Sequence, residues 1–290
     1  MEPLSQLDFG HLTRNRDALI ALATPQDLLR LCPDASEISV PSVLTSHFQQ
    51  SPAVLNAHQR FVATRPAKWA WVLRALASGG QDVSNLVDVP VDVIQATSRM
   101  GDTGLVLAVC HFGLHMLAPY ALGAMVRGMR IAGAGGDEGV TIVDAVRAFA
   151  PELASRVEYF SLPHKFVLLK LARRLRSGGC VVMYPEVSVV PEREPLLRNL
   201  VGHVVRAPAG IENLARISGA PVLPLAMIED RDLHFQVHAG APVTYSRPGT
   251  VTDHVFSWLG SAIERWPEQW FAWRFFDMMI DSGDQAAKPT

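Results

Sequence analysis

The chain has 290 residues, of which 49% are hydrophobic and 19% are charged, and its formal net charge is −2. It is long enough to bury a large core, and its near-neutral charge argues against general nucleic-acid binding, because a surface that reads a phosphate backbone normally carries an excess of Lys and Arg. Its three cysteines are an odd number without paired spacing, which indicates neither a disulfide framework nor a zinc site and favours a cytoplasmic location. The N-terminus lacks the pattern of a secretory signal, and no run of about 18 apolar residues is free of charge, so we expect a soluble protein that could still lie on a membrane surface.

Residues 1–100 are predicted to form a helical section that packs on the rest of the chain. Prolines punctuate this section and indicate short helices. The segment 58–80 has an apolar face at helical spacing, and the pair Gly79-Gly80 predicts its end. The prolines are Pro3, Pro25, Pro33, Pro41, Pro52 and Pro66.

From residue 103 onward, short apolar runs alternate with amphipathic segments. Strands separated by helices predict an α/β domain over residues 101–280, with a largely parallel central sheet flanked by helices. The expected strands are 105–110, 129–134, 157–160, 180–184, 221–228 and 233–238, the last two forming a hairpin at one edge. The expected helices are 114–127, 140–150, 164–176, 208–218 and a C-terminal region from residue 250; a long loop covers 186–207, and residues 281–290 are expected to form a disordered tail.

His111 stands where the buried strand 105–110 ends and the next helix begins. A histidine at the carboxyl end of a buried strand projects into the crevice where open α/β sheets bind their ligands. Its imidazole can take a proton from an alcohol or an amine near neutral pH, so we single it out as a general base. The alternative is a histidine that only satisfies the free N–H groups of the helix, and position alone does not separate the two.

His115 and Glu186 are the other candidate catalytic residues. His115 follows His111 by four residues, which puts both imidazoles over one helical turn if the helix starts at His111, and each would then hold down the pKa of the other. Glu186 follows an apolar strand and would face the same crevice, unless it is a solvated loop acid. The two histidines lack a third ligand at useful spacing, so neither a metal nor a cofactor is implied. Cys110 points to the opposite face from His111 and is more typical of a core residue than of a nucleophile.

Four residues are candidates for substrate binding. The glycines permit the close approach of a ligand or of another backbone, and the arginine could hold a phosphate, although a lone arginine before a helix is usually a surface residue. They are Gly113, Gly202, Arg206 and Gly210.

The segment from Lys165 to Arg176 has the pattern of a basic amphipathic helix. One interpretation is a solvated face. The other is a docking surface for an acidic carrier protein, for the phosphate of phosphopantetheine or for an anionic membrane.

Four sequence pieces stand in a fixed order along the chain: CHFGLHM around His111, MYPE from Met183 to Glu186, LARISGAPVLPL from Leu214 to Leu225, and WPEQWFAWRFF from Trp266 to Phe276. Together they resemble the lysophospholipid acyltransferase-like superfamily, in particular the lipid A biosynthesis (lauroyl or myristoyl) acyltransferase branch, from about Val106 to Asp277. The resemblance implies a glycerolipid acyltransferase-like fold and a histidine that deprotonates the acceptor of an acyl group.

Two departures from that branch stand out. Its signature is a histidine, four residues and then Asp or Glu, and the acid orients the imidazole. Here that position is Met116, which accepts no hydrogen bond of any strength. Losing the orienting acid is expected to cost orders of magnitude in rate unless another group replaces it, and His115 and Glu186 are the nearest candidates. Members of the branch also usually begin with a membrane-anchoring helix, which we do not expect in this chain.

These observations predict a soluble acyltransferase that moves an acyl or aminoacyl group from an activated ester or thioester to a hydroxyl or an amine. His111 would act as the base, and backbone N–H groups at the start of the following helix would stabilise the oxyanion. The donor would be an acyl carrier protein, coenzyme A or an aminoacyl-tRNA, and the acceptor a small specialised metabolite or a lipid. Two alternatives stay open: a non-catalytic relative that binds an acyl chain or an acyl carrier, supported by Met116, and a peripheral membrane lysolipid or lipid A-type acyltransferase.

Overall fold

The computed structural model of the chain describes residues 34–47, 51–77, 85–99, 103–126, 129–135, 143–144, 146–148, 151–162, 166–186, 195–231 and 233–281. Some predictions fall on other residues and lie outside this part of the chain. They are the helix end at Gly79-Gly80, most of the helix 140–150, the first residues of the helix 164–176, and the tail beyond residue 281.

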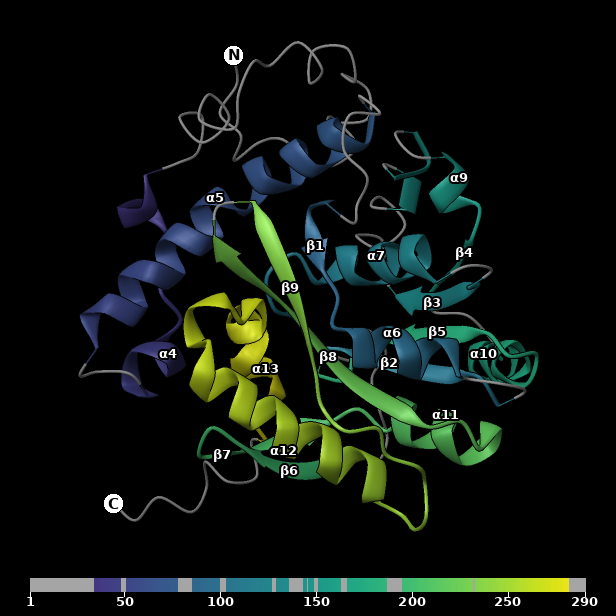
Figure 1. The fold of residues 1–290 in the computed structure, drawn as a ribbon. Coiled ribbons are helices and arrows are strands. Elements are labelled where there is room, and N and C mark those ends of the chain that lie inside the picture. Colours follow the sequence, from purple (N-terminus) through teal and green to yellow (C-terminus); the bar gives the residue numbers. More distant parts are fainter. Residues whose placement is uncertain are drawn as a thin grey trace.

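A seven-stranded sheet forms the centre of the described structure, with the strand order β1-β9-β8-β2-β5-β3-β4 (Figure 1). Neighbouring strands run parallel except for the antiparallel pair β8 and β9. The strands are β1 (Val87–Asp88), β2 (Leu105–Val109), β3 (Ile131–Gly135), β4 (Val157–Ser161), β5 (Cys180–Met183), β8 (Val222–Arg231) and β9 (His234–Ala239). The predicted α/β fold with a largely parallel central sheet is confirmed.

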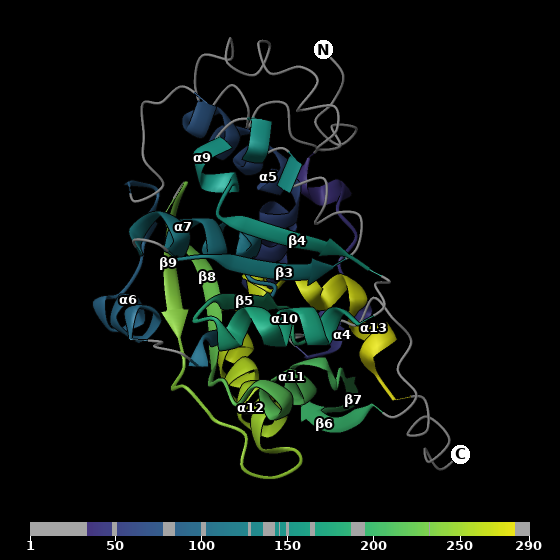
Figure 2. The same cartoon turned by 90° about the vertical axis from the view of Figure 1, so that its right-hand side faces the viewer.

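Helices cover both faces of this sheet (Figure 2). The α-helices in the described part are α4 (Ser42–His47), α5 (Pro52–Ala77), α6 (Val91–Ser98), α7 (Ala118–Met125), α9 (Pro151–Ala154), α10 (Val167–Arg176), α11 (Gly210–Ser218), α12 (Thr250–Arg265) and α13 (Phe276–Met279). Short 3-10 helices are η2 (Ala35–Glu37), η5 (His115–Leu117), η6 (Pro267–Gln269) and η7 (Phe271–Phe275).

The alternation of side chains along β2 explains why both faces must be covered. Leu105, Leu107 and Val109 enter a core shared with α5, α6 and α7. Val106 and Ala108 enter a second core shared with α10, α11 and α12. Every residue of β2 is buried, as the continuous apolar run predicts for a central parallel strand.

The N-terminal section differs from the prediction in two ways. Pro66 does not end a short helix but lies inside the 26-residue helix α5. Proline removes one hydrogen bond of a helix, and here the buried face that includes Trp69 and Val72 holds the helix together across it. The section also contributes β1, which pairs with β9. The predicted β8–β9 hairpin is therefore formed, but β1 and not the hairpin provides that edge of the sheet.

The predicted loop 186–207 contains a hairpin of its own, β6 (Leu196–Leu200) and β7 (His203–Ala207). The two strands are joined by Val201 and Gly202, which both have positive φ, at 45° and 82°. Two positive φ values in a two-residue connection are the pattern that fits the twist of a hairpin. Valine rarely adopts such a conformation, so the sequence carries a weak signal for this turn.

The helix predicted from residue 114 begins later. The 3-10 helix η5 comes first, and α7 starts at Ala118 with Pro119 in its first turn, where the fixed φ of proline suits a helix start. None of the helices in the described part of the chain combines the length and the apolar character that crossing a membrane requires.

Candidate active site

His111 and Glu186 follow two adjacent parallel strands. β2 and β5 are parallel neighbours, with Leu105 opposite Cys180 and Ala108 opposite Met183. Both strands therefore end at the same edge of the sheet. Because the carboxyl ends of neighbouring parallel strands meet there, the two residues come together although 75 positions separate them in the sequence. The interpretation of Glu186 as a solvated loop acid is wrong, since only 1% of the residue is exposed.

The carboxylate of Glu186 holds His111 at two points. The backbone N–H of His111 donates to Oε1 at 2.7 Å, and ring nitrogen Nδ1 lies 3.0 Å from Oε2. With the Nδ1 proton directed to a carboxylate, a neutral imidazole keeps its lone pair on Nε2. The side chain of His111 is 13% exposed, so the ring is largely enclosed.

A third donor reaches the same carboxylate from the C-terminal part of the chain. The indole Nε1–H of Trp270, which is fully buried, donates to Oε1 of Glu186 at 3.2 Å. Trp270 sits beside Phe112 in an antiparallel bridge, and the backbone N–H of Phe271 donates to the carbonyl of His111 at 2.7 Å. The segment around Trp270 is therefore part of the site.

His115 and Tyr184 pack around the ring of His111. The ring centroids of His111 and His115 are 4.6 Å apart, and that of Tyr184 lies 5.0 Å from His111 and 5.5 Å from His115. Burial holds the pKa of His115 well below its usual range, and nearby His111 and Arg65 lower it further. His115 is therefore neutral near pH 7, and its Nδ1 is buried without a hydrogen-bond partner among the described residues. The predicted closeness of the two imidazoles is confirmed, although a 3-10 turn rather than an α-helix produces it.

Cys110 is a core residue, as the strand alternation predicts. Its side chain is completely buried and belongs to the core formed by α12 and the C-terminal aromatic residues. Burial raises the pKa of its thiol well above the usual value, and the Glu186 carboxylate adds to this rise. A thiol that resists ionisation is a poor nucleophile. Within the described residues, no group of three His, Cys, Asp or Glu side chains gathers in a way that could hold a metal ion.

The predicted oxyanion site at the start of a helix is not formed directly after His111. The backbone N–H of His111 binds Glu186, that of Phe112 donates to the carbonyl of Cys110, and that of Gly113 donates to the carbonyl of Gln269. The 3-10 turn that follows is too short to present a row of free amides.

Each of the four candidate substrate-binding residues has a place in the fold that accounts for it without a substrate. Gly113 has φ +54°, and a Cβ built on it would lie 2.3 Å from the carbonyl oxygen of Met227. Gly202 forms the β6–β7 turn and Gly210 begins α11. Arg206 lies 3.6 Å from the carboxylate of Asp281 and is partly exposed. No hydrogen bond or ion pair that we find in the described residues joins these four to the side chain of His111, and their contact with a substrate stays a prediction.

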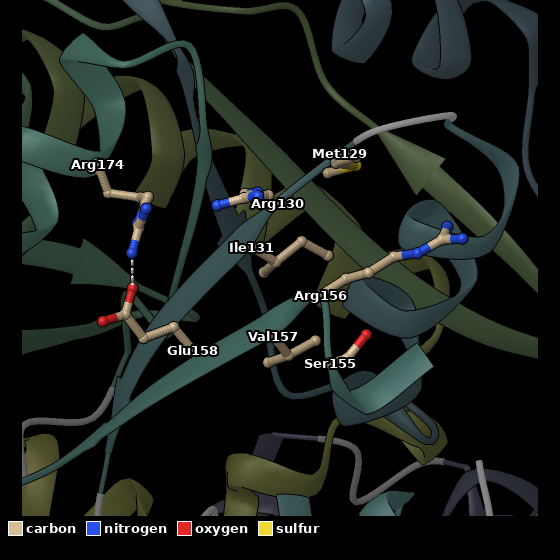
Figure 3. Close-up of a pocket in the computed structure, with 8 residues that line it drawn as sticks. All are labelled: Met129, Arg130, Ile131, Ser155, Arg156, Val157, Glu158 and Arg174. Carbon is tan, nitrogen blue, oxygen red and sulfur yellow. Dashed lines mark hydrogen bonds and ion pairs between the residues drawn. The ribbon is translucent and has the colours of Figure 1, made fainter. Parts of the chain in front are cut away.

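A basic surface lies at the opposite edge of the sheet. A hollow of about 440 Å³ opens at the amino ends of β3 and β4, beside α10 (Figure 3). Arg130 lies between the ion pair of Arg174 with Glu158 and the side chain of Arg156, whose guanidinium extends away to the carbonyl of Gly123. A second hollow of about 330 Å³ continues along α10. Its lining residues are Glu158, Phe160, Lys170, Arg173, Arg174 and Ser177.

Comparison with known families is consistent with this geometry. The family model described as bacterial lipid A biosynthesis acyltransferase matches residues 148–274. This match supports the assignment predicted from the four sequence pieces, and it supports acyl transfer as the general class of activity. The match includes Glu186 and Trp270 and begins after His111. A search of curated proteins found no match to the chain.

Sequence reasoning missed Trp270 and Tyr184 as parts of the site. Trp270 lies in the PEQW piece that carries the resemblance, and Tyr184 directly follows β5, so both stood next to recognised signals. No local pattern tells which acceptor an indole N–H will find 84 residues away.

Proposed function

We propose that this chain is an acyltransferase in which Nε2 of His111 removes the proton from a hydroxyl or amine acceptor. One observation carries the proposal: the Glu186 carboxylate contacts both the backbone N–H and the ring nitrogen Nδ1 of His111. Glu186 supplies the orienting carboxylate that a histidine base requires, from the turn after β5 and not from the position of Met116.

The reaction follows from this geometry. As the acceptor oxygen or nitrogen forms a bond to the acyl carbonyl carbon, its proton passes to Nε2 of His111. Glu186 stabilises the imidazolium through the Nδ1–H bond. When the tetrahedral intermediate collapses, the carbon–sulfur bond of a thioester donor breaks and the Nε2 proton passes to the leaving thiolate, which restores the neutral base.

The position of Glu186 removes the main reason to regard the protein as a non-catalytic relative. Met116 supports that alternative only if no other acid reaches His111. Met116 is 9% exposed and packs in the core with α5 and α7, so it has a role in packing instead.

We propose that the donor is a thioester on an acidic carrier protein that binds the outer face of α10. Lys170 and Arg173 are exposed on this helix, and Leu169 on the same helix is 51% exposed. A basic face with some apolar area fits an acidic protein surface by charge and by contact. Coenzyme A and aminoacyl-tRNA are the other donors that we consider, and the acceptor is a small metabolite or a lipid.

The test is acyl transfer by the purified full chain. Lauroyl and myristoyl thioesters of an acyl carrier protein and of coenzyme A serve as donors, with a panel of hydroxyl and amine acceptors and with water as the default acceptor. Intact-protein mass spectrometry measures loss of the acyl group from the carrier. We expect His111→Ala to lower turnover at least about 1,000-fold and Glu186→Gln at least about 100-fold.

The matched control is His254→Ala, because His254 is a surface histidine whose Nε2 donates to the carbonyl of Ala241. Its turnover should equal that of the wild type. Full turnover by folded His111→Ala protein would disprove the proposed mechanism, and acyl-carrier binding without any turnover by the wild type would favour the non-catalytic alternative.

A further inference from the structure

We infer that Trp270 is a positioning residue that fixes the Glu186 carboxylate so that Glu186 can orient His111. This inference rests on the proposed function of His111 as a base. Trp270 acts through Glu186, so it supports the chemistry without touching the acyl group.

The hydrogen bonds around Glu186 explain why a third donor is useful. Oε1 accepts from the backbone N–H of His111 at 2.7 Å and from the indole of Trp270 at 3.2 Å, while Oε2 faces Nδ1 of His111 at 3.0 Å. Two donors on Oε1 leave Oε2 as the oxygen that meets the imidazole. The carboxylate is thus held in one rotational state, and its charge is stabilised in a buried position.

The segment that carries Trp270 is itself held in place. The side-chain amide of Gln269 makes two bonds to the backbone of Glu229 on β8, with Oε1 accepting at 2.8 Å and Nε2 donating at 2.9 Å. The carbonyl of Gln269 accepts from Gly113 at 3.1 Å. Together with the bond from Phe271 to His111, these contacts lock the backbone on both sides of Trp270. Because this backbone is already fixed, the indole N–H of Trp270 loses little conformational entropy when it donates to the Glu186 carboxylate.

Trp273 provides the internal control. It is buried like Trp270, belongs to the same aromatic cluster and has its ring centroid 4.7 Å from that of Trp270. Its indole N–H donates to the carbonyl of Pro267 at 2.8 Å, so it has the same chemistry but a different acceptor.

The experiment compares Trp270→Phe with Trp273→Phe in the full chain. Each variant loses one buried indole hydrogen bond and some packing, so we expect similar losses of stability. Only Trp270→Phe should lower kcat, by about 10-fold, with KM for the acyl-carrier thioester nearly unchanged. The pH profile of kcat/KM should also change in Trp270→Phe, whereas that of Trp273→Phe should match the wild type. In a Glu186→Gln background, Trp270→Phe should cost no further turnover.

A second measurement needs no turnover. In ¹⁵N-labelled protein, Glu186→Gln should shift the indole N–H signal of Trp270 and leave that of Trp273 in place, and Trp270→Phe should shift the imidazole nitrogen signals of His111. Equal kcat and pH profiles for the two tryptophan variants, or an unshifted Trp270 signal in Glu186→Gln, would overturn the inference. An inactive wild type with the expected shifts would instead refute the proposed function while keeping the contact between Trp270 and Glu186.

Discussion

The two edges of the parallel sheet, at the carboxyl and amino ends of its strands, are built in opposite ways. At the carboxyl ends of β2 and β5, the carboxylate of Glu186 is buried and three N–H donors from two separate chain segments meet it. At the amino ends of β3 and β4, arginines surround open hollows, and the ion pair of Arg174 with Glu158 is partly exposed.

The difference indicates that one edge of the sheet orients a side chain, while the other attracts a charged partner. Buried N–H dipoles fix one geometry and are screened little by salt. Exposed cations fix no geometry, but they attract an anionic partner over several ångströms, and salt weakens them. We therefore propose that the chemistry takes place at the carboxyl edge and that the face of α10 captures the donor.

Two glycines test whether the carboxyl edge has the tight packing that orientation requires. Gly113 and Gly202 both have positive φ, but a Cβ on Gly113 would clash with the Met227 carbonyl, while a Cβ on Gly202 would meet nothing within 4 Å. We expect Gly113→Ala to lower the free energy of unfolding by about 3 kcal/mol, from strain plus overpacking. Gly202→Ala should cost only about 1 kcal/mol, from the backbone conformation alone.

Urea unfolding of the two variants measures these costs, and the acyl-transfer assay follows the consequence at His111. Because Gly113 lies two residues after His111, its variant should also lose turnover in the folded fraction. Equal costs for the two variants would contradict the tight packing that we describe.

Charge reversal on α10 tests the other edge. Arg173→Glu should raise KM for an acyl-carrier thioester about five-fold at low salt and leave kcat unchanged, because it weakens encounter and not chemistry. High salt should reduce the difference. The control is Arg247→Glu, an equal change of charge at an exposed loop position.

Two outcomes would contradict docking of a carrier on α10. One is an unchanged KM in Arg173→Glu. The other is a loss of binding to anionic phospholipid vesicles with the carrier KM intact, which would point to a membrane surface as the occupant of this face.

The sequence predicts the carboxyl edge better than the amino edge. Buried apolar runs marked β2 and β5, and since parallel strands end together, His111 and Glu186 could be placed at one crevice from the pattern alone. The sequence could not decide whether His115 or Glu186 orients His111, because the contact between Glu186 and His111 depends on the register of β2 against β5, which no local signal encodes. The carboxylate also comes from the turn after β5 and not from Met116 in η5, where the family signature would place an acid.

The missed features share one physical cause, which is long-range pairing. The β6–β7 hairpin turns at Val201, a residue whose type argues against a turn, and the pairing of the flanking strands outweighs that preference. α5 continues through Pro66 because the packing of its buried face against the core stabilises the helix. The basic character of α10 was visible in the sequence, but the hollows beside it depend on β3 and β4, which lie far away in the chain.

The smallest expected effect concerns His115 and the pH dependence of stability. Burial, together with nearby His111 and Arg65, holds the pKa of this imidazole well below its usual range in the folded protein. In the unfolded chain it titrates near a pKa of about 6.5. As pH falls below that value, the unfolded state binds a proton that the folded state does not, so the free energy of unfolding decreases.

His115→Gln removes this titration and should reduce the loss of stability between pH 7.5 and pH 5.5 by about 1 kcal/mol, measured by urea unfolding at both values. His58→Gln should have a smaller effect, because burial lowers the pKa of His58 while its bond to the Glu268 carbonyl opposes that shift. If the site at the carboxyl edge were as open to water as the surface of α10, His115 would titrate alike in both states. The free energy of unfolding of the wild type and of His115→Gln would then fall by the same amount between pH 7.5 and pH 5.5. That result would contradict the difference in burial between the two edges.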